Sequence, residues 1–145
     1  MKNNREIKFR VWSKKYNKWI NNCAVIDCDG NIDSHFLEIR DNGERIEHIV
    51  ELSKEENIIQ QFTGLLDKNN KEIYEGDIIN FETYGIPHGP ERDYIKNAEV
   101  YYDEKLVSFC FGRFNNGEYK YTYQMTDRID KKTLEVVGNI FEKKI

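Results

Sequence analysis

The 145-residue chain alternates short apolar runs with turn signals, a pattern typical of antiparallel β structure. The stretch "EIKFRVW" is the clearest strand, because every second residue from Ile7 to Val11 is apolar and such residues share one face. Further along, Asp29-Gly30 and Asn42-Gly43 each stand between β-forming residues, where they favour two-residue hairpin turns. We therefore expect the first fifty residues to form a meander of two or three hairpins.

A two-residue turn also fixes which residues face each other across a hairpin. In the second hairpin it places Ile39 opposite Ile46, and His48 opposite Leu37. The pattern thus predicts a register as well as a strand pair.

Residues 53–62 fit two structures. Ser53 and Glu56 have the spacing of a capping box, and the apolar residues from Ile58 to Phe62 could form the stripe of a short helix. A strand that begins near Ile58 fits the same residues. The choice between helix and strand stays open.

Beyond Glu75 the apolar runs predict about five more strands, the number in a small SH3-like barrel. The stretch "TYGIPHGPERDYIKN" interrupts them with both prolines of the chain and two glycines, which is typical of a long surface loop. The predicted fold class is mostly β, with an N-terminal β-meander over residues 1–55 and a C-terminal SH3-like barrel over residues 56–145. At most one or two short helices are expected.

Composition narrows the classes of partner. The net charge is −4 and the pI about 5.5, whereas proteins that depend on phosphate contacts are usually basic. Nucleic acid is therefore possible as a partner but disfavoured by charge, although a local basic patch is compatible with this total. The first fifteen residues show no apolar h-region, so we expect no secretory signal, and no apolar run approaches the ~20 residues of a membrane helix. The three cysteines show no disulfide framework. We expect a cytoplasmic protein without a membrane partner.

Three stretches, "REIKFRVWSKKYNKWI", "QFTGLLDKNNKEIYEGDII" and "LEVVGNIFE", resemble in order and spacing the YopX-like family of phage and prophage proteins of Gram-positive bacteria. The resemblance implies a phage-encoded protein in the bacterial host, an SH3-like barrel in the C-terminal half and no established biochemical activity. It therefore transfers no catalytic residue. The chain departs from the family where Asn69-Asn70 replaces the usual Asn-Gly of the central turn, and where "FEKKI" lacks Asn-Pro after the closing strand.

Candidate metal ligands are poorly placed. Cys23 and Cys28 have opposite parity on one predicted strand, so they point to opposite faces even though His35 is near. The carboxylates of the central motif lack the repeating ligand positions of a calcium loop. Their better role is to accept backbone N–H groups in the neighbouring turns, with Asp67 and Asp77 the best placed. We expect neither a metal nor another cofactor.

Tyrosines form the strongest candidate binding surface. Tyr119, Tyr121 and Tyr123 share one face of a predicted strand with Tyr101 nearby, and could stack on single-stranded nucleic acid or a proline-rich peptide. Tyrosines of small β-barrels more often cover the core or a subunit interface, and we favour that role.

His88 is the remaining candidate, because it shares its loop with Glu91 and Asp93. No Gly-x-Ser-x-Gly elbow and no phosphate-binding glycine pattern accompanies it. We therefore expect a binding or oligomeric protein that is not an enzyme, with a second copy of itself and a host or phage protein as partners. A barrel that binds single-stranded nucleic acid is the alternative, and a hydrolase that uses the His88 loop is less well supported.

Overall fold

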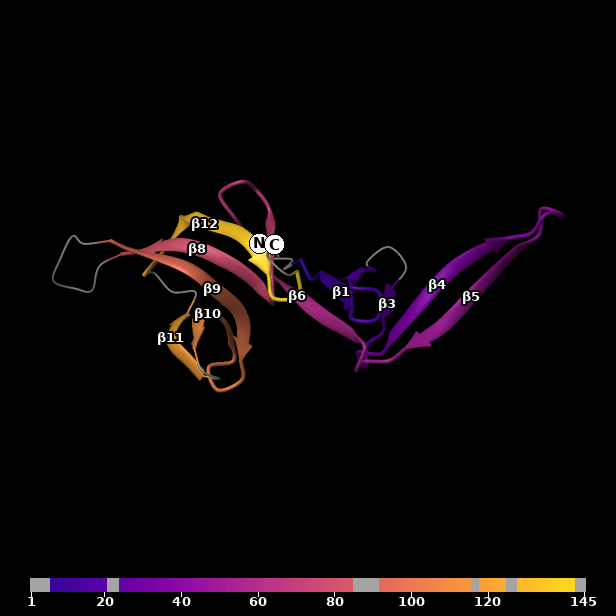
Figure 1. Ribbon diagram of the computed structural model, residues 1–145, viewed down its shortest axis with the longest axis horizontal. Coiled ribbons are helices and arrows are strands. Elements are labelled where there is room, and N and C mark those ends of the chain that lie inside the picture. The colour runs from indigo at the N-terminus through magenta and orange to yellow at the C-terminus, as the bar shows by residue number, and fades with distance from the viewer. Residues whose placement is uncertain (1–5, 21–23, 85–91, 116–117, 125–127, 143–145) are drawn as a thin grey trace, which may run out of the picture. The chain divides into compact units, whose positions relative to one another are not determined.

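The computed structural model (Figure 1) describes residues 6–20, 24–84, 92–115, 118–124 and 128–142, without the side chains of 113–115 and 118–121. This part of the chain holds strands and turns and no helix, which confirms the predicted mostly-β class. Accordingly, none of the described residues belongs to a helix that could span a membrane. The strands are β1 (Phe9–Ser13), β2 (Lys18–Trp19), β3 (Ala24–Ile26), β4 (Ile32–Ile39), β5 (Arg45–Leu52), β6 (Asn57–Leu66), β7 (Glu72–Tyr74), β8 (Asp77–Thr83), β9 (Asp93–Asp103), β10 (Ser108–Asn115), β11 (Glu118–Gln124) and β12 (Ile129–Asn139).

The segment from Ser53 to Phe62 is a turn followed by a strand, which decides between the two structures that the sequence allowed. Ser53 Oγ accepts the Glu55 N–H at 3.2 Å, and the Ser53 carbonyl accepts the Asn57 N–H at 3.0 Å. A serine side chain that bonds two residues onward stabilises a turn and not a helix start. β6 then begins at Asn57.

The chain divides into two compact units, of which one is residues 9–60 and the other the remainder of the described chain. The second unit contains a curled five-stranded antiparallel sheet in the order β11-β10-β9-β8-β12 (Figure 1). The prediction of five strands after Glu75 is confirmed. Closure of this sheet into an SH3-like barrel stays a prediction, because β11 and β12 lie at opposite ends of the order.

The core of this second unit follows from the alternation along its strands. In β8 every second residue from Asp77 to Thr83 is buried, so one face of the strand turns inward. The Phe81 ring lies 5.5 Å from the Phe111 ring of β10. The core residues are Ile73, Ile79, Phe81, Ala98, Val100, Phe111, Ile129 and Leu134.

The unit of residues 9–60 holds β1 to β5 and the beginning of β6. β2 pairs with β1 and sets Trp19 opposite Trp12, whose rings meet edge to face with centroids 4.9 Å apart. β3, β4 and β5 form a separate antiparallel sheet in that order. Val11, Trp12 and Ile32 are buried in this unit.

The β4–β5 turn has three residues and not two, and this shifts the predicted register by one. Arg40 N–H donates to the Glu44 carbonyl at 2.9 Å, and Gly43, with φ 82°, donates its N–H to the Arg40 carbonyl at 2.8 Å. Asp41, Asn42 and Gly43 therefore form a three-residue loop with glycine in the left-handed position. As a result His48 faces Phe36, and the predicted pairings of Ile39 with Ile46 and of His48 with Leu37 are wrong.

The same turn occurs twice more. Asp27 and Asn31 close a loop over Gly30, with φ 77°, and Asp67 and Lys71 close a loop over Asn70, with φ 62°. Cys28 thus lies in the first of these loops and not on a strand, so its predicted strand position is wrong, while Cys23 lies outside the described residues. At the central turn Asn70 takes the left-handed conformation, which asparagine tolerates better than most residues other than glycine.

Candidate functional site

Asp67 is a buried carboxylate that holds two parts of the fold together. Its Oδ1 accepts the N–H groups of Asn69 at 2.8 Å and Lys71 at 2.9 Å, and its Oδ2 accepts the N–H of Val136 at 3.1 Å. Burial alone would raise the pKa of Asp67, but these three hydrogen bonds favour the charged form and lower the pKa overall. The prediction that this side chain caps its turn is confirmed.

Asp77, at the other end of the central motif, has a similar role. Its Oδ2 accepts the Tyr74 N–H at 2.9 Å, and its Oδ1 accepts the Asn139 side-chain amide at 3.1 Å. The carboxylate therefore fixes the bend before β8 and ties it to the end of β12. The carboxylates of the motif serve the architecture of this unit.

Glu72 belongs to the same motif and pairs with a cation. Lys8 Nζ donates to Glu72, and the Tyr74 hydroxyl donates to the second carboxylate oxygen at 2.8 Å. The hydrogen bonds from Lys8 and Tyr74 lower the pKa of Glu72, and the bond to Glu72, followed by that to Glu6, raises the pKa of Lys8. Both carboxylate oxygens of Glu72 therefore have a hydrogen-bond donor within this unit.

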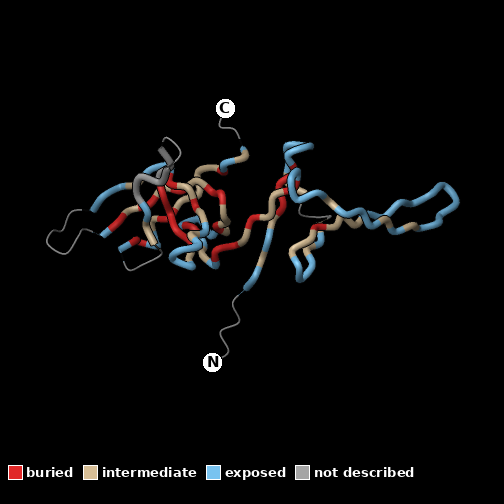
Figure 2. Tube along the Cα trace, turned by 90° about the horizontal axis from the view of Figure 1, so that it is seen from below, coloured by how far each residue is buried: buried red, intermediate tan, exposed pale blue. Residues whose placement is uncertain are grey.

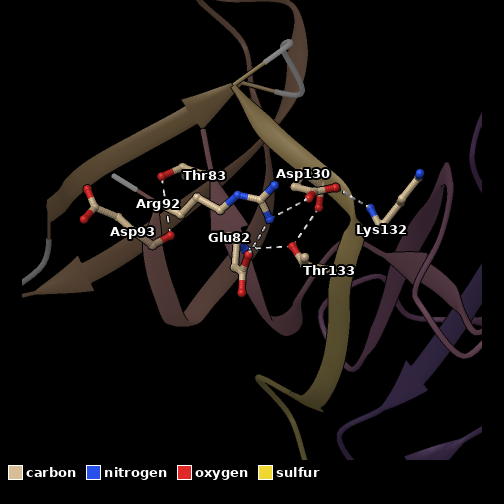
Figure 3. A network of polar contacts seen from close by, with 7 residues as sticks. All are labelled: Glu82, Thr83, Arg92, Asp93, Asp130, Lys132 and Thr133. Atoms are coloured by element: carbon tan, nitrogen blue, oxygen red, sulfur yellow. Dashed lines mark hydrogen bonds and ion pairs between the residues drawn. The ribbon is translucent and has the colours of Figure 1, made fainter. Parts of the chain in front are cut away.

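The predicted loop site can be assessed only at its edge, because His88 and Glu91 lie outside the described residues. Next to that loop, Arg92 bridges two strands (Figure 3). Its Nη1 donates to Glu82 Oε2 at 3.2 Å and lies 3.5 Å from Asp130 Oδ2. The guanidinium thus contacts two carboxylates.

This network stands where the β8–β12 pairing is interrupted between Asp130 and Glu135. Thr133 Oγ1 accepts the Glu82 N–H at 2.8 Å and donates to the Asp130 carbonyl at 2.7 Å (Figure 3). Asp130 Oδ1 in turn accepts the Lys132 N–H at 3.1 Å. Side chains therefore replace ladder hydrogen bonds at this irregularity. The role that these contacts support is a structural one, to stabilise β12 where its pairing with β8 is interrupted.

Two tyrosines of the predicted binding surface, Tyr101 and Tyr123, lie on opposite faces of the sheet. Tyr123 is opposite Phe111, and its ring meets the core residue Phe81 edge to face with centroids 5.5 Å apart. Tyr101 is opposite Cys110, on the other face, where its hydroxyl lies 2.8 Å from Thr122 Oγ1. The structure therefore does not bring Tyr101 and Tyr123 onto one face.

The other two tyrosines, Tyr119 and Tyr121, are in β11, but their side chains lie outside the described residues.

Around Tyr101, burial raises the pKa of its hydroxyl more than the hydrogen bond with Thr122 lowers it. Burial also raises the pKa of the neighbouring Cys110 thiol. Both groups are thus held in their neutral forms.

The β4–β5 hairpin presents a surface that the sequence prediction did not identify (Figures 1 and 2). β3 pairs with residues 32–34 of β4, so among the residues that the structure describes the outer half of the hairpin consists of two strands. Five apolar side chains are exposed on these strands, and they point to both faces. They are Phe36, Leu37, Ile39, Ile49 and Val50, with exposed fractions from 47% to 65%.

Both histidines of the hairpin are paired with glutamates. His48 Nε2 lies 2.6 Å from Glu38 Oε2, and the His48 ring stacks on Phe36 with centroids 4.8 Å apart. His35 lies 3.5 Å from Glu47 in an ion-pair geometry. These contacts order the side chains without covering the apolar residues.

A signal for this surface is present in the sequence. Strands with one solvated face alternate apolar and polar residues, whereas Phe36-Leu37 and Ile49-Val50 are adjacent apolar residues. Adjacent apolar residues place a hydrophobic side chain on each face of a strand. In a two-stranded hairpin this predicts two apolar faces without a layer to cover them.

No group of three or more histidine, cysteine, aspartate and glutamate side chains is arranged for a metal ion within the described part of the chain. The residues brought together by the fold are thus a buried carboxylate motif, an arginine bridge and an apolar hairpin. Of these, the hairpin is the group whose present contacts leave its surface exposed.

Comparisons with known proteins place the chain among its relatives. A family model described as "YopX protein" matches residues 8–144. A search of the solved structures found protein EF1440 from Enterococcus faecalis, which is 21% identical, with a TM-score of 0.51 and a match over 94% of each chain. At this identity the likeness concerns the fold alone. A search of the curated proteins found no match.

Proposed function

The chain belongs to the YopX protein family, and from this premise we propose that it is a phage or prophage accessory protein that acts by binding and self-association. It works without catalysis or a cofactor, in the cytoplasm of the bacterial host. Its first partner is a second copy of the same chain. A host or phage protein binds the resulting assembly.

The observation that carries this proposal is the exposed β4–β5 hairpin. An isolated two-stranded hairpin is marginally stable in water, because two strands bury little apolar surface. Here the outer half has apolar side chains on both faces, and Ile39 and Ile49 are 65% and 61% exposed. Covering these residues with another chain removes apolar area from water, at roughly 25 cal/mol per Å².

β5 also has an edge that no strand of the described residues covers. It is the last strand in the order β3-β4-β5. Because Arg40 donates to the Glu44 carbonyl, the antiparallel alternation turns the backbone groups of Arg45, Glu47 and Ile49 away from β4. These groups supply the hydrogen bonds that an added strand needs.

Symmetry restricts how two copies of β5 can pair. A two-fold axis perpendicular to the sheet leaves each side chain on the same face of the sheet in both copies. Directly opposite residues also share a face, so an odd-numbered residue can face only an odd-numbered one, and an even-numbered residue only an even-numbered one. Centred on His48, this pairing aligns seven residues and sets Arg45 opposite Glu51 and Ile46 opposite Val50, each twice. In this register opposite charges face each other, and apolar side chains face apolar side chains.

The neighbouring registers are worse. A pairing centred on Ile49 also aligns seven residues, but it sets Glu47 opposite Glu51 twice. A pairing centred on Glu47 sets that carboxylate against its own copy. Like charges directly opposite are destabilising. The charges of β5 therefore select the register centred on His48.

Light scattering after size-exclusion chromatography tests this proposal at micromolar concentration. We expect a dimer or larger assembly for the unaltered chain and a monomer for Glu47→Pro, because proline removes an outward N–H at the open edge. The control is Leu37→Pro, since Leu37 faces Glu47 across the hairpin and its N–H lies on the opposite edge. This variant should still associate.

Either of two results would contradict the proposal. A clean monomer of the unaltered chain rejects self-association. Dissociation by Leu37→Pro but not by Glu47→Pro assigns the contact to β4 and rejects the β5 edge. Circular dichroism of both variants shows whether the hairpin substitutions leave the β structure in place.

A further inference from the structure

Residues 7–20 form a segment of net positive charge in an acidic chain. Residues 7–20 contain five cations and no carboxylate. Since the whole chain carries −4, the other residues carry −9, that is −4 − 5. The five cations are Lys8, Arg10, Lys14, Lys15 and Lys18.

Four of these cations, Arg10, Lys14, Lys15 and Lys18, belong to the β1–β2 hairpin, whereas Lys8 precedes it and pairs with Glu6 and Glu72. Trp12 and Trp19 face each other, and the Arg10 guanidinium lies 4.3 Å from the centre of the Trp19 ring. Arg10 also donates to Gln60 Oε1 at 2.9 Å. Arg10 therefore holds the hairpin together, while the lysines of the turn remain on the surface.

The turn between β1 and β2 presents an aromatic ring among ammonium groups. Tyr16 is 63% exposed, and its N–H donates to the buried Ser13 hydroxyl at 3.3 Å. Lys15 Nζ and Lys18 Nζ lie 5.4 Å and 5.7 Å from the centre of its ring. Asn17, with φ 51°, closes the turn in the left-handed conformation.

The lysines of this turn have no ion pair with any described carboxylate, which leaves their charge to act on a ligand. An acidic segment, the turn before β6, lies beside this turn, because Lys14 N–H donates to the Glu56 carbonyl at 2.7 Å. That turn adds Lys54, Glu55 and Glu56, so the two turns together carry a net +2. The two contacting turns are therefore positive when taken together.

We infer that this tip, formed by Lys14, Lys15, Tyr16 and Lys18, binds single-stranded nucleic acid. The ammonium groups contact phosphates, and the Tyr16 ring stacks on a base. A membrane surface is disfavoured, since interfacial binding needs several apolar side chains and Tyr16 is the single aromatic residue of the turn. This site is separate from the β5 edge and does not depend on self-association.

Fluorescence anisotropy with a labelled oligothymidylate and the full chain tests this site. Binding without sequence specificity is expected at about 1–100 μM. Three phosphate contacts predict that log K falls with log salt at a slope of roughly −2. The variant K14Q/K15Q/K18Q should lose this binding, whereas K105Q/K131Q/K132Q, which removes three exposed lysines elsewhere, should retain it.

Two tyrosine variants distinguish the contribution of base stacking from that of charge. Tyr16→Ala should weaken oligonucleotide binding by roughly 5-fold or more, the effect of one lost base stack. Tyr94→Ala is the control, because Tyr94 is 51% exposed and has Lys96 Nζ 5.6 Å from its ring centre. This control should bind as the unaltered chain does.

The inference is overturned if the chain does not bind the oligonucleotide at low salt, or if both triple-lysine variants lose binding equally. Equal affinities of Tyr16→Ala and the unaltered chain would also overturn it, by showing a general polyanion surface. A parallel titration with vesicles of anionic phospholipid tests whether lipid headgroups, which also present phosphates, bind to the same lysines. Binding to the vesicles but not to the oligonucleotide rejects the nucleic-acid assignment.

Discussion

Asp67 Oδ2 accepts the backbone N–H of Val136 at 3.1 Å, so one carboxylate joins a turn to a strand 69 residues further along the chain. We expect Asp67→Asn to reduce the free energy of unfolding by about 2–3 kcal/mol, since an amide nitrogen cannot accept this N–H in the buried site. Urea unfolding of both proteins measures the change. Asp27→Asn is the control, because Asp27 is exposed and accepts the N–H groups of Asp29 and Asn31 in the same kind of turn, while its Oδ2 accepts the side-chain amide of Asn31 and not a distant backbone group. An equal loss in both variants would show that the buried bond to Val136 contributes no more than the exposed bond between Asp27 and the Asn31 side chain.

The lowered pKa of Asp67 also predicts a pH dependence. A carboxyl group whose pKa is lower in the folded than in the unfolded protein stabilises the fold above the unfolded pKa, about 3.9 for aspartate. That contribution is lost as the pH falls through the folded pKa. The stability difference between the unaltered chain and Asp67→Asn should therefore be full at pH 7 and shrink below pH ~4. A difference that stays constant on acidification would contradict the role of the charged form.

Asn70 offers a test of the central turn. It adopts φ 62°, a conformation that costs an ordinary residue about 1 kcal/mol, asparagine less and glycine nothing. We expect Asn70→Gly to raise the free energy of unfolding by about 0.5 kcal/mol and Asn70→Ala to lower it by about 1 kcal/mol. Thermal and urea unfolding measure both. The opposite order of the two variants would show that the asparagine side chain, and not its backbone conformation, stabilises the turn.

The strands themselves were predictable because hydrophobic alternation is local. β1, the five strands after Glu75 and the caps at Asp67 and Asp77 all follow from residues close in sequence. Register was not predictable to the residue, since Asp-Gly and Asn-Gly occur both in two-residue turns and at the end of three-residue turns. The difference of one residue moved His48 from Leu37 to Phe36.

The candidate surfaces were harder to predict for a different reason. Whether Tyr101 and Tyr123 share a face depends on pairing across β10, which relates residues far apart in the chain. The arginine bridge from Arg92 to Asp130 likewise needs the β8–β12 pairing to be known. The apolar hairpin and the lysine turn, by contrast, have local signals in the sequence. The first is marked by adjacent apolar residues and the second by a run of cations without a carboxylate.

Thr133 tests whether the network beside β8 is structural. Its Oγ1 accepts the Glu82 N–H at 2.8 Å in place of a ladder hydrogen bond. Thr133→Val keeps the shape but removes the acceptor, and we expect it to cost about 1–2 kcal/mol of unfolding free energy. Thr133→Ser keeps the hydroxyl and should cost less. Hydrogen exchange at the Glu82 amide gives a local readout, and unchanged protection in Thr133→Val would contradict the assigned bond.

The register proposed for two copies of β5 predicts a charge reversal that only this register explains. Arg45→Glu sets two glutamates opposite each other at both ends of the paired strands, and Glu51→Arg sets two arginines there. Each single variant should therefore weaken the dimer, whereas the double variant R45E/E51R restores the opposite charges and should restore the association. Sedimentation equilibrium at several salt concentrations measures the three dissociation constants, and the effect of the single variants should fade as salt screens the charges. Both residues are exposed in the hairpin, so the substitutions leave the fold of the monomer intact. If the double variant dissociates as readily as the single variants, Arg45 and Glu51 do not face each other, and a pairing centred on His48 is excluded.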